Sequence, residues 1–339
     1  MPPLPVLIVG AGNRADLYAR LLAECFAAEL VLVGFVSRGE ARARDAAQRF
    51  DVPWATAGDL EDAAFRWGAA GAVICPSSDA NATMARRVAA QGLPFLLETP
   101  PSLDVAEAES LRDFVAAQGV AVEVAEQNPR GPEAGFAREA VGSGKLGDVR
   151  LAACDLAGYR YHATAVGRAL LGRPRGRRAS ALRTVVPGLP PHAASIVAGT
   201  IEAEGGRMLQ LRESEGIYLP NSPWRSGGWS VYGSRGSLGR DELCIGGTVE
   251  RVRYESAQVG SVSFTASVAC GEVIWTAGRL DAALDDDARA VAACLDDWLA
   301  RIDGRPAPRG WSLADAVDDL RWIVALERSA TLGGAPVTL

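Results

Sequence analysis

The chain of 339 residues has very few side chains that exchange a proton near neutral pH. It contains two histidines, His162 and His192, and a single lysine, Lys145, among its 35 lysines and arginines. Arginine stays protonated and is a poor proton donor, whereas the pKa of lysine or histidine can be adjusted toward pH 7. Lysine chemistry therefore has one possible position, and histidine chemistry has two.

Features of several other classes of protein are also missing. The six cysteines form no Cys-x-x-Cys pair, which argues against a zinc site and a disulfide framework and favours buried free thiols. No apolar run approaches the roughly 18 residues of a membrane helix, and no basic residue precedes the apolar stretch near the N-terminus. We therefore expect a cytoplasmic protein without a membrane contact. A net charge of -6 provides no basic surface for nucleic acid, so we expect a small-molecule partner.

The most informative stretch is VLIVGAGNRADL, residues 6–17, in which an apolar run leads directly into glycines and a helix start. This pattern is typical of a buried parallel strand that ends in a tight turn. Gly10, Gly12 and Ala15 have the Gly-x-Gly-x-x-Ala spacing that lets backbone N–H groups approach a pyrophosphate at a helix N-terminus. The segment therefore predicts a dinucleotide site.

A second apolar run, LVLVGFV at residues 30–36, predicts the next strand, and Ser37 and Arg38 follow it. Sites for NAD usually have Asp or Glu here to bind the ribose 2′-hydroxyl, whereas a small hydroxyl followed by arginine suits a 2′-phosphate. Ser37 and Arg38 therefore favour NADP(H). Arg42 and Arg44 are candidate helpers, although each is also compatible with an ordinary solvated helix.

Short apolar strands then alternate with helices of about a dozen residues, which indicates a doubly wound parallel sheet with α/β architecture. We expect this Rossmann domain to span residues 1–127. Beyond it, long extended segments follow one another without helices and predict a mostly antiparallel sheet in an α+β domain of residues 128–339, with the C-terminal helix packing back on the Rossmann domain. The expected segments are strands at 71–75, 95–97, 120–125, 149–156, 193–204, 208–213, 229–233 and 248–254, and helices at 15–28, 81–91, 105–118, 285–302 and 313–332.

Seven short motifs in order resemble the Gfo/Idh/MocA family of nicotinamide-dependent oxidoreductases over nearly the full length. They are VGAGNRA (9–15), CPSS (75–78), LLETPPS (96–102), EQNPR (126–130), GKLGDVR (144–150), VYGSRGSL (231–238) and ERSATLGGAPVTL (327–339). Within the family, GRALLG (167–172) is most similar to the thiazolinyl imine reductases. The resemblance implies a homodimer or homotetramer formed through the C-terminal sheet. It implies cofactor contacts at Gly10, Gly12, Asn13, Arg14, Ala15, Ser37, Arg38, Cys75, Pro76, Ser77, Glu98 and Gln127.

One departure from the family pattern affects the chemistry. Where the family has a Glu-Lys-Pro lysine that binds substrate and transfers a proton, this chain has Thr99, preceded by Glu98. A threonine hydroxyl can hydrogen-bond a substrate oxygen but is too weak an acid to donate a proton unaided. Lys145 lies in a turn outside the motif and does not replace the missing lysine.

His162 is the strongest candidate for the proton donor. It lies in Tyr159-Arg160-Tyr161-His162, before a helix-like segment, and similar Tyr-His segments of some family members face the nicotinamide. An imidazole with its ordinary pKa of about 6.5 is a competent general acid at neutral pH. Tyr161 is a second candidate donor, and a surface helix-capping histidine is the alternative interpretation. Asp155 is a candidate to orient His162, whereas His192 is expected to be structural.

Further polar residues are candidates for the substrate site. Asn128 and Arg130 follow the last Rossmann strand, at the edge where open α/β sheets bind ligands. The resemblance adds Tyr159 and Arg168. Arginines at 173, 175, 177, 178 and 183 fit either a mobile loop over an anionic substrate or a solvated loop.

Two functions are compatible with these observations. The first is an NADP(H)-dependent reductase that transfers a hydride to a C=N or C=O group of a small metabolite. The second is a catalytically impaired, cofactor-binding or scaffolding protein that has kept the pocket after losing the lysine. The distinction depends on whether an acid other than Thr99 serves the reacting centre.

Overall fold

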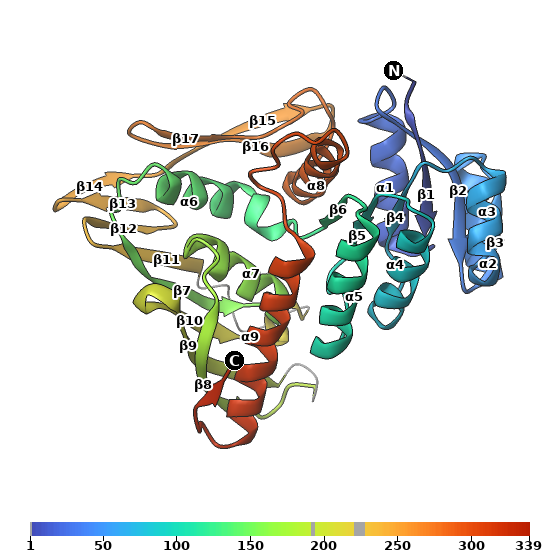
Figure 1. Ribbon diagram of the computed structural model, residues 1–339. Coiled ribbons are helices and arrows are strands. Elements are labelled where there is room, and N and C mark those ends of the chain that lie inside the picture. Colours follow the sequence, from blue (N-terminus) through green and yellow to red (C-terminus); the bar gives the residue numbers. More distant parts are fainter. Residues whose placement is uncertain (1, 191–193, 220–227) are drawn as a thin grey trace. The chain divides into compact units, whose positions relative to one another are not determined.

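The computed structural model describes residues 2–190, 194–219 and 228–339. Contacts divide the chain into two units (Figure 1). The first comprises residues 1–127 and 288–317, and the second comprises residues 128–287 and 318–339. Within the described ranges, no helix is long and apolar enough to cross a membrane.

The first unit is built on a six-stranded sheet in which every neighbouring pair of strands is parallel. The apolar run at its centre becomes β1, whose last four residues are buried. This sheet confirms the predicted doubly wound architecture, since a strand covered on both faces must be apolar throughout. In spatial order the strands are β3 (Trp54–Thr56), β2 (Leu30–Ser37), β1 (Leu4–Val9), β4 (Gly71–Ile74), β5 (Phe95–Leu97) and β6 (Val122–Val124).

Helices connect these strands, and their ends follow local capping rules. The side chain of Asp104 accepts a hydrogen bond from the Glu107 N–H at the start of α5, and Gly119 ends that helix in the left-handed conformation at φ 66°. The first helix begins at Asn13 rather than at the expected Ala15. The helices of this segment are α1 (Asn13–Glu24), α2 (Glu40–Phe50), α3 (Leu60–Arg66), α4 (Asn81–Ala90) and α5 (Val105–Gln118), with short 3₁₀ helices η1 (Ala57–Asp59) and η2 (Ser78–Ala80).

A late segment of the chain, residues 288–317, also belongs to the first unit and contains most of α8 (Asp286–Ile302). Glu123 of β6 is fully buried, and its carboxylate lies 2.5 Å from Arg301 Nε and accepts the Trp311 N–H at 2.5 Å. We expected the C-terminal helix to pack on the Rossmann domain. The structure places α8 and the segment after it in this unit, where Arg301 pairs with the buried Glu123 carboxylate, and the packing of the C-terminal helix stays a prediction.

The second unit is organised around a nine-stranded sheet. Its pairs are antiparallel except β7 with β10, so it is a mixed sheet that is mostly antiparallel, as predicted. In spatial order its strands are β14 (Thr248–Arg251), β13 (Glu242–Ile245), β12 (Gly236–Gly239), β11 (Gly228–Gly233), β7 (Val149–Ala157), β10 (Arg207–Glu213), β9 (Ser195–Ala203), β8 (Gly176–Val185) and β18 (Val337–Thr338).

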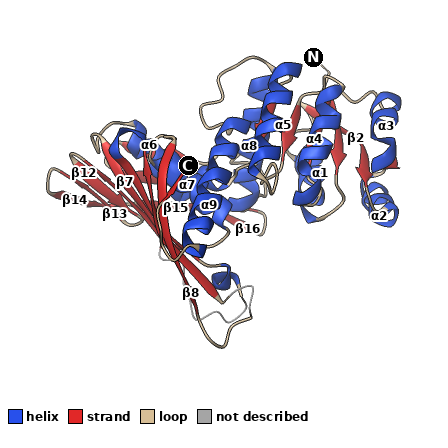
Figure 2. Cartoon of the chain, turned by 60° about the horizontal axis from the view of Figure 1, so that its bottom comes forward, coloured by secondary structure: helices blue, strands red, loops and turns tan. Residues whose placement is uncertain are grey.

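Helix α7 (Arg160–Leu170) lies against β7 and β10 of this sheet, and α6 (Pro132–Gly142) packs against α7 (Figure 2). A second sheet, β15 (Arg253–Val259), β16 (Val262–Cys270) and β17 (Val273–Thr276), contacts α6 through its last two strands. One apolar core joins both sheets and includes Phe136, Leu209 and Trp275, together with Trp322 of α9 (Leu313–Thr331). The 3₁₀ helices are η3 (Asn128–Arg130), η4 (Glu204–Gly206) and η5 (Glu215–Tyr218).

Two sequence-based expectations for this unit need correction. The single strand expected at residues 248–254 is two strands in different sheets, because the chain leaves β13 and β14 at Val252 and begins the next hairpin. The expected arginine-rich loop is largely the strand β8, where Arg178 pairs with Glu202 on β9 at 2.5 Å. His192 and Ala193 lie outside the described residues, so the predicted structural role of His192 stays a prediction.

Candidate functional site

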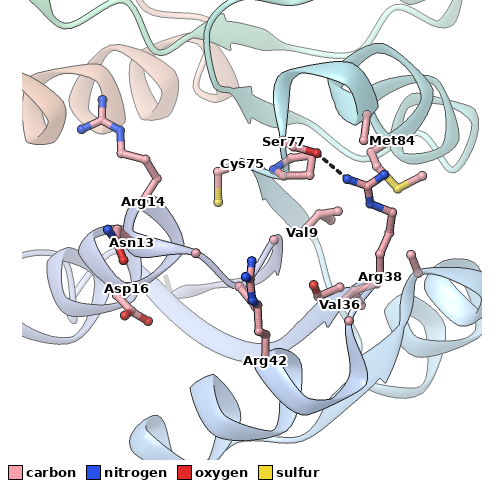
Figure 3. A pocket seen from close by; sticks show the side chains of 18 of the residues that line it. Val9, Asn13, Arg14, Asp16, Val36, Arg38, Arg42, Cys75, Ser77 and Met84 are labelled. Carbon is pink, nitrogen blue, oxygen red and sulfur yellow. Dashed lines mark hydrogen bonds between the residues drawn. The ribbon is translucent and has the colours of Figure 1, made fainter. Parts of the chain in front are cut away.

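A cavity of about 850 Å³ lies in the first unit at the carboxyl ends of β1, β2 and β4. This is the edge at which open parallel sheets bind ligands. Figure 3 shows side chains from α1, the end of β2 and the segment after β4 converging on it. Of the predicted cofactor residues, the structure brings Gly10, Gly12, Asn13, Arg14, Ser37, Arg38, Cys75, Pro76 and Ser77 to its wall, whereas Ala15 is buried in α1 and neither Glu98 nor Gln127 lines the cavity.

The two glycines of the motif have different physical roles. Gly10 has φ +135°, and a Cβ built on it would lie 2.5 Å from the Cys75 carbonyl oxygen, so the fold itself requires glycine there. A Cβ on Gly12 would meet nothing within 4 Å, although Gly12 lines the cavity and forms the N-cap of α1 without a side-chain cap. Ser or Asp at this position would cap α1 better, so helix stability does not explain the glycine. Without a side chain, Gly12 leaves open space in front of the first N–H groups of α1, and this space fits a pyrophosphate.

We therefore expect substitution of Gly12 to impair mainly dinucleotide binding and substitution of Gly10 to impair mainly stability. Gly12→Ala should weaken dinucleotide binding about 10- to 100-fold, the value of one charge-assisted hydrogen bond, while changing the free energy of unfolding by less than about 1 kcal/mol. Gly10→Ala should lower that free energy by more than about 2 kcal/mol, through the left-handed strain and the contact with Cys75. Calorimetric titration and urea unfolding measure the two effects. Parallel losses in both variants would contradict this division of roles.

Positive charge predominates on the cavity wall. Arg14, Arg38, Arg42 and Arg49 line it, against the carboxylates Asp16 and Asp45. Arg49 donates two hydrogen bonds to Asp16, at 2.7 and 2.8 Å, and these raise the pKa of Arg49 and neutralise the carboxylate near the start of α1. The remaining excess of guanidinium groups suits a polyanionic ligand.

Arg38 reaches across the cavity to the segment after β4 (Figure 3). Its Nη2 donates to the Ser77 hydroxyl at 2.5 Å, and its Nη1 lies 3.3 Å from Asp79 Oδ2. Both Arg38 and Asp79 are largely exposed. Of the two candidate helpers, Arg42 lines the cavity, whereas Arg44 pairs with Glu40 at 2.5 Å and stacks on Trp54. The structure thus brings Ser37, Arg38 and Arg42 to one cavity and leaves Arg44 out.

Glu98 follows β5 and is held by several donors. Its Oε1 accepts hydrogen bonds from Arg14 Nε at 2.9 Å and from the buried Tyr18 hydroxyl at 2.7 Å, and its Oε2 accepts the Thr99 N–H at 3.2 Å. Burial, and then the nearby Glu98, raise the pKa of Tyr18 well above its usual value, so Tyr18 is a permanent donor. Asn81 fixes the same loop by donating to the carbonyls of Glu98 and Pro100, at 3.1 and 2.8 Å. The loop therefore has a defined shape, and Thr99 within it is half-buried.

The Tyr-His segment forms the beginning of α7 in the second unit. Tyr159, the residue before α7, has φ +45° and is 55% exposed, which is unusual for a bulky residue and is found at functional sites. The half-buried His162 ring contacts Tyr159 and the buried Tyr161 edge-on, with centroids 6.2 and 6.0 Å apart. His162 lies in the first turn of the helix rather than at its cap. Asp155, the candidate to orient His162, accepts a hydrogen bond from Arg212 Nε at 2.5 Å. The sequence had not indicated this arginine as a partner of Asp155.

Arg168 occupies an environment that does not suit the predicted contact with substrate. Its side chain is 1% exposed, its Nη1 lies 2.6 Å from the fully buried Asp319, and its Nη2 lies 3.4 Å from Asp318. The guanidinium also lies 5.5 Å from the Trp322 ring centroid. These contacts join α7 to α9, so we reassign Arg168 to the internal packing of the second unit.

An ion cluster lies at the start of α7. Arg160 Nε lies 2.6 Å from Glu213 of β10, Arg160 also pairs with Glu327 of α9, and Arg183 of β8 pairs with the same glutamate. Burial raises the pKa of Glu213 to about 7 in spite of Arg160. The cluster connects three elements to the residues beside His162 and stabilises the first turn of the helix.

The residues after β6 separate into two environments. Gln127 and Arg130 are buried, and Gln127 Oε1 has no hydrogen-bond partner among the described residues. Asn128 is exposed and lines a second cavity, of about 670 Å³, within the second unit. Val166 and Trp229 also line this cavity, and Val166 lies four residues after His162 and therefore on the same side of α7. Asn128 is thus a predicted substrate residue that the structure places beside a cavity.

Some relevant residues had no signal in the sequence. Arg49 and Asp79 contribute charge at the first cavity or its rim, and Tyr18 and Asn81 fix the Glu98 loop, yet none belongs to a short motif. None of the six cysteines, all of which lie in the described ranges, forms a disulfide, and Cys25 and Cys244 are only partly buried. In the described ranges, no group of three or more His, Cys, Asp or Glu side chains is suited to a metal ion.

Comparisons with known proteins agree with this architecture. The crystal structure of GenD2 from gentamicin A biosynthesis, in complex with NAD, superposes on this chain with a TM-score of 0.73 at 20% identity. The match covers 100% of this chain and 97% of the GenD2 chain. The aldose-aldose oxidoreductase of Caulobacter crescentus, complexed with glycerol, has a TM-score of 0.73 at 17% identity over 99% of this chain and 100% of its own. An inositol dehydrogenase homolog of Azotobacter vinelandii, complexed with NAD⁺, has a TM-score of 0.73 at 17% identity over 100% and 98%.

At these identities the structural matches show a shared fold. A search of curated protein sequences found no match. The model of one sequence family, described as "Oxidoreductase family, NAD-binding Rossmann fold", matches residues 4–126, which include β1 to β6 and every residue of the first cavity. Residues 4–126 are therefore similar to the NAD-binding Rossmann domain of the Gfo/Idh/MocA oxidoreductase family.

Proposed function

We propose that the protein is a nicotinamide-dependent oxidoreductase that prefers NADP(H) and reduces a C=N or C=O group of a small metabolite. The observation that supports this proposal most directly is the first cavity, in which the open Gly12 turn is joined to Ser37 and a projecting Arg38. Several structural neighbours contain NAD. The preference for a 2′-phosphate is proposed from this chain's own residues, because no carboxylate stands at the end of β2.

A reduced nicotinamide supplies a hydride when bound. Gly12 and the first turn of α1 would hold the pyrophosphate, and Ser37 and Arg38 would hold the 2′-phosphate. His162, or Tyr161 beside it, would donate the proton that the substrate nitrogen or oxygen gains, while Asn128 and Tyr159 would contact the substrate. Thr99 would contribute a hydrogen bond at the place of the family lysine, and Glu98 would orient its loop.

An imine of the thiazolinyl type is the substrate we favour, for a chemical reason. An imine nitrogen is more basic than a ketone oxygen and can take its proton, here from His162, before the hydride arrives, so its reduction depends less on a lysine at position 99 than the reduction of a ketone does. The resemblance of GRALLG to thiazolinyl imine reductases supports the same choice. The second candidate, a catalytically impaired cofactor-binding or scaffolding protein, is favoured by Thr99 and would bind the dinucleotide without turnover. The predicted homodimer or homotetramer through the nine-stranded sheet and the cytoplasmic location belong to this proposal.

The cofactor preference is directly measurable. We expect NADPH to bind at least about tenfold more tightly than NADH, which corresponds to about 1.4 kcal/mol for one charge-assisted phosphate contact. Arg38→Ala should abolish the difference, and Arg66→Ala, which removes an exposed arginine paired with Asp62, should not. Fluorescence titration of both coenzymes checks this. Equal affinities in the wild type would refute the NADP(H) preference, and a preference that persists in Arg38→Ala would transfer the phosphate contact to Arg42.

A further inference from the structure

The surroundings of Arg38 contain a charge that a site for a 2′-phosphate does not need. Arg38 Nη1 lies 3.3 Å from Asp79 Oδ2, and its Nη2 donates to Ser77 Oγ at 2.5 Å. Ser77 lies in the segment after β4 and Asp79 in η2. Neither residue belongs to the end of β2, which is where the residue that determines cofactor choice normally lies. Both terminal nitrogens of the guanidinium are therefore engaged by this segment.

We propose that Asp79 is a second determinant of cofactor choice, which limits the affinity of the site for a 2′-phosphate by competing for Arg38. This inference rests on the proposed binding of a dinucleotide in the first cavity. A 2′-phosphate that pairs with Arg38 comes close to the Asp79 carboxylate, and two like charges about 4 Å apart repel each other even in water. A ribose with a free 2′-hydroxyl carries no such charge. Asp79 thus reduces the difference in affinity between NADPH and NADH.

The ionisation of Asp79 is consistent with this role. The hydrogen bond from Ser77, and then the charge of Arg38, hold the pKa of Asp79 below its usual value, so the carboxylate is charged throughout the neutral range. Its side chain is 57% exposed, and dissolved salt should therefore screen its effect on a ligand.

Fragments of the adenosine end test the inference without requiring a hydride transfer. Affinities for adenosine 2′,5′-bisphosphate and adenosine 5′-monophosphate are measured by calorimetry for the wild type and for Asp79→Asn. We expect the variant to bind the bisphosphate about fivefold more tightly, with the monophosphate unchanged within twofold, and the gain to shrink when the salt concentration rises. Asp62→Asn is the matched control, because it removes an exposed aspartate that also pairs with an arginine, 2.8 Å from Arg66, outside the cavity.

Other outcomes would contradict the proposed role of Asp79, the proposed cofactor site or the proposed reductase activity. An unchanged or weaker affinity for the bisphosphate in Asp79→Asn, an equal gain for both fragments, or the same gain in Asp62→Asn would overturn the role of Asp79. If the wild type binds neither fragment, this inference and the proposed cofactor site both fail. If the fragments bind with the expected pattern but no NADPH is oxidised with any imine or ketone, only the proposed reductase activity fails.

Discussion

Replacing His162 with alanine should lower turnover about a hundredfold or more and leave the affinity for NADPH unchanged within about twofold. General acid catalysis contributes a factor of this size, and His162 lies in α7 of the second unit, whereas the residues proposed to bind the cofactor lie in the first. The measurement is the oxidation of NADPH with an imine or ketone that the wild type reduces. Binding of NADPH is titrated separately in the same preparations.

The neighbouring tyrosine provides the control for this experiment. Tyr161→Phe keeps the buried ring that contacts His162 edge-on and removes the hydroxyl alone. A larger loss in Tyr161→Phe than in His162→Ala would transfer the proton donation to the phenol. Unimpaired turnover in both variants would remove the start of α7 from the mechanism. A wild type that binds NADPH but reduces no imine or ketone would favour the catalytically impaired alternative.

Replacing Arg168 with alanine should lower the free energy of unfolding by about 3–5 kcal/mol, because the buried Asp319 carboxylate would lose the guanidinium charge that lies against it. Asp319 is fully buried, and its Oδ1 lies 2.6 Å from Arg168 Nη1. Urea unfolding followed by far-ultraviolet circular dichroism measures this loss. A loss below about 1 kcal/mol would show that the pair contributes no more than a surface ion pair does.

Two further variants separate the effect of burying the Arg168–Asp319 pair from the effect of its charges. Arg178→Ala breaks an ion pair of similar length, 2.5 Å to Glu202, but both partners are exposed, so its cost should stay below about 1 kcal/mol. The double variant Arg168→Met with Asp319→Leu removes both buried charges together. We expect it to lose less stability than Arg168→Ala alone, since an apolar replacement of a buried pair is often neutral. A double variant as unstable as the sum of its single variants would indicate that shape rather than charge dominates at this site.

The sequence by itself predicted five of the six parallel strands of the first unit, but neither β3 nor the assignment of residues 288–317 to this unit. Short apolar runs that alternate with helical segments predicted these strands, and the spacing of Gly10, Gly12 and Ala15 predicted the turn that opens into the first cavity. These signals are local, because a strand buried on both faces must be apolar and a turn with positive φ favours glycine. The position of Arg38 was readable for the same reason, since it directly follows a strand whose end is predictable.

Only the tertiary structure decided which charges meet. Arg168 was a candidate for the substrate site until α9 brought Asp319 to it across 151 positions of sequence. Similarly, Glu123 is neutralised by Arg301 from α8, and Arg38 meets Asp79 from a segment 41 residues away. The period of a pattern shows which face of an element is apolar but not which distant side chain lies opposite a given charge. That information arises from the crossing of segments in the folded chain, so the sequence located the glycine turn while the fold determined which carboxylates the arginines around it meet.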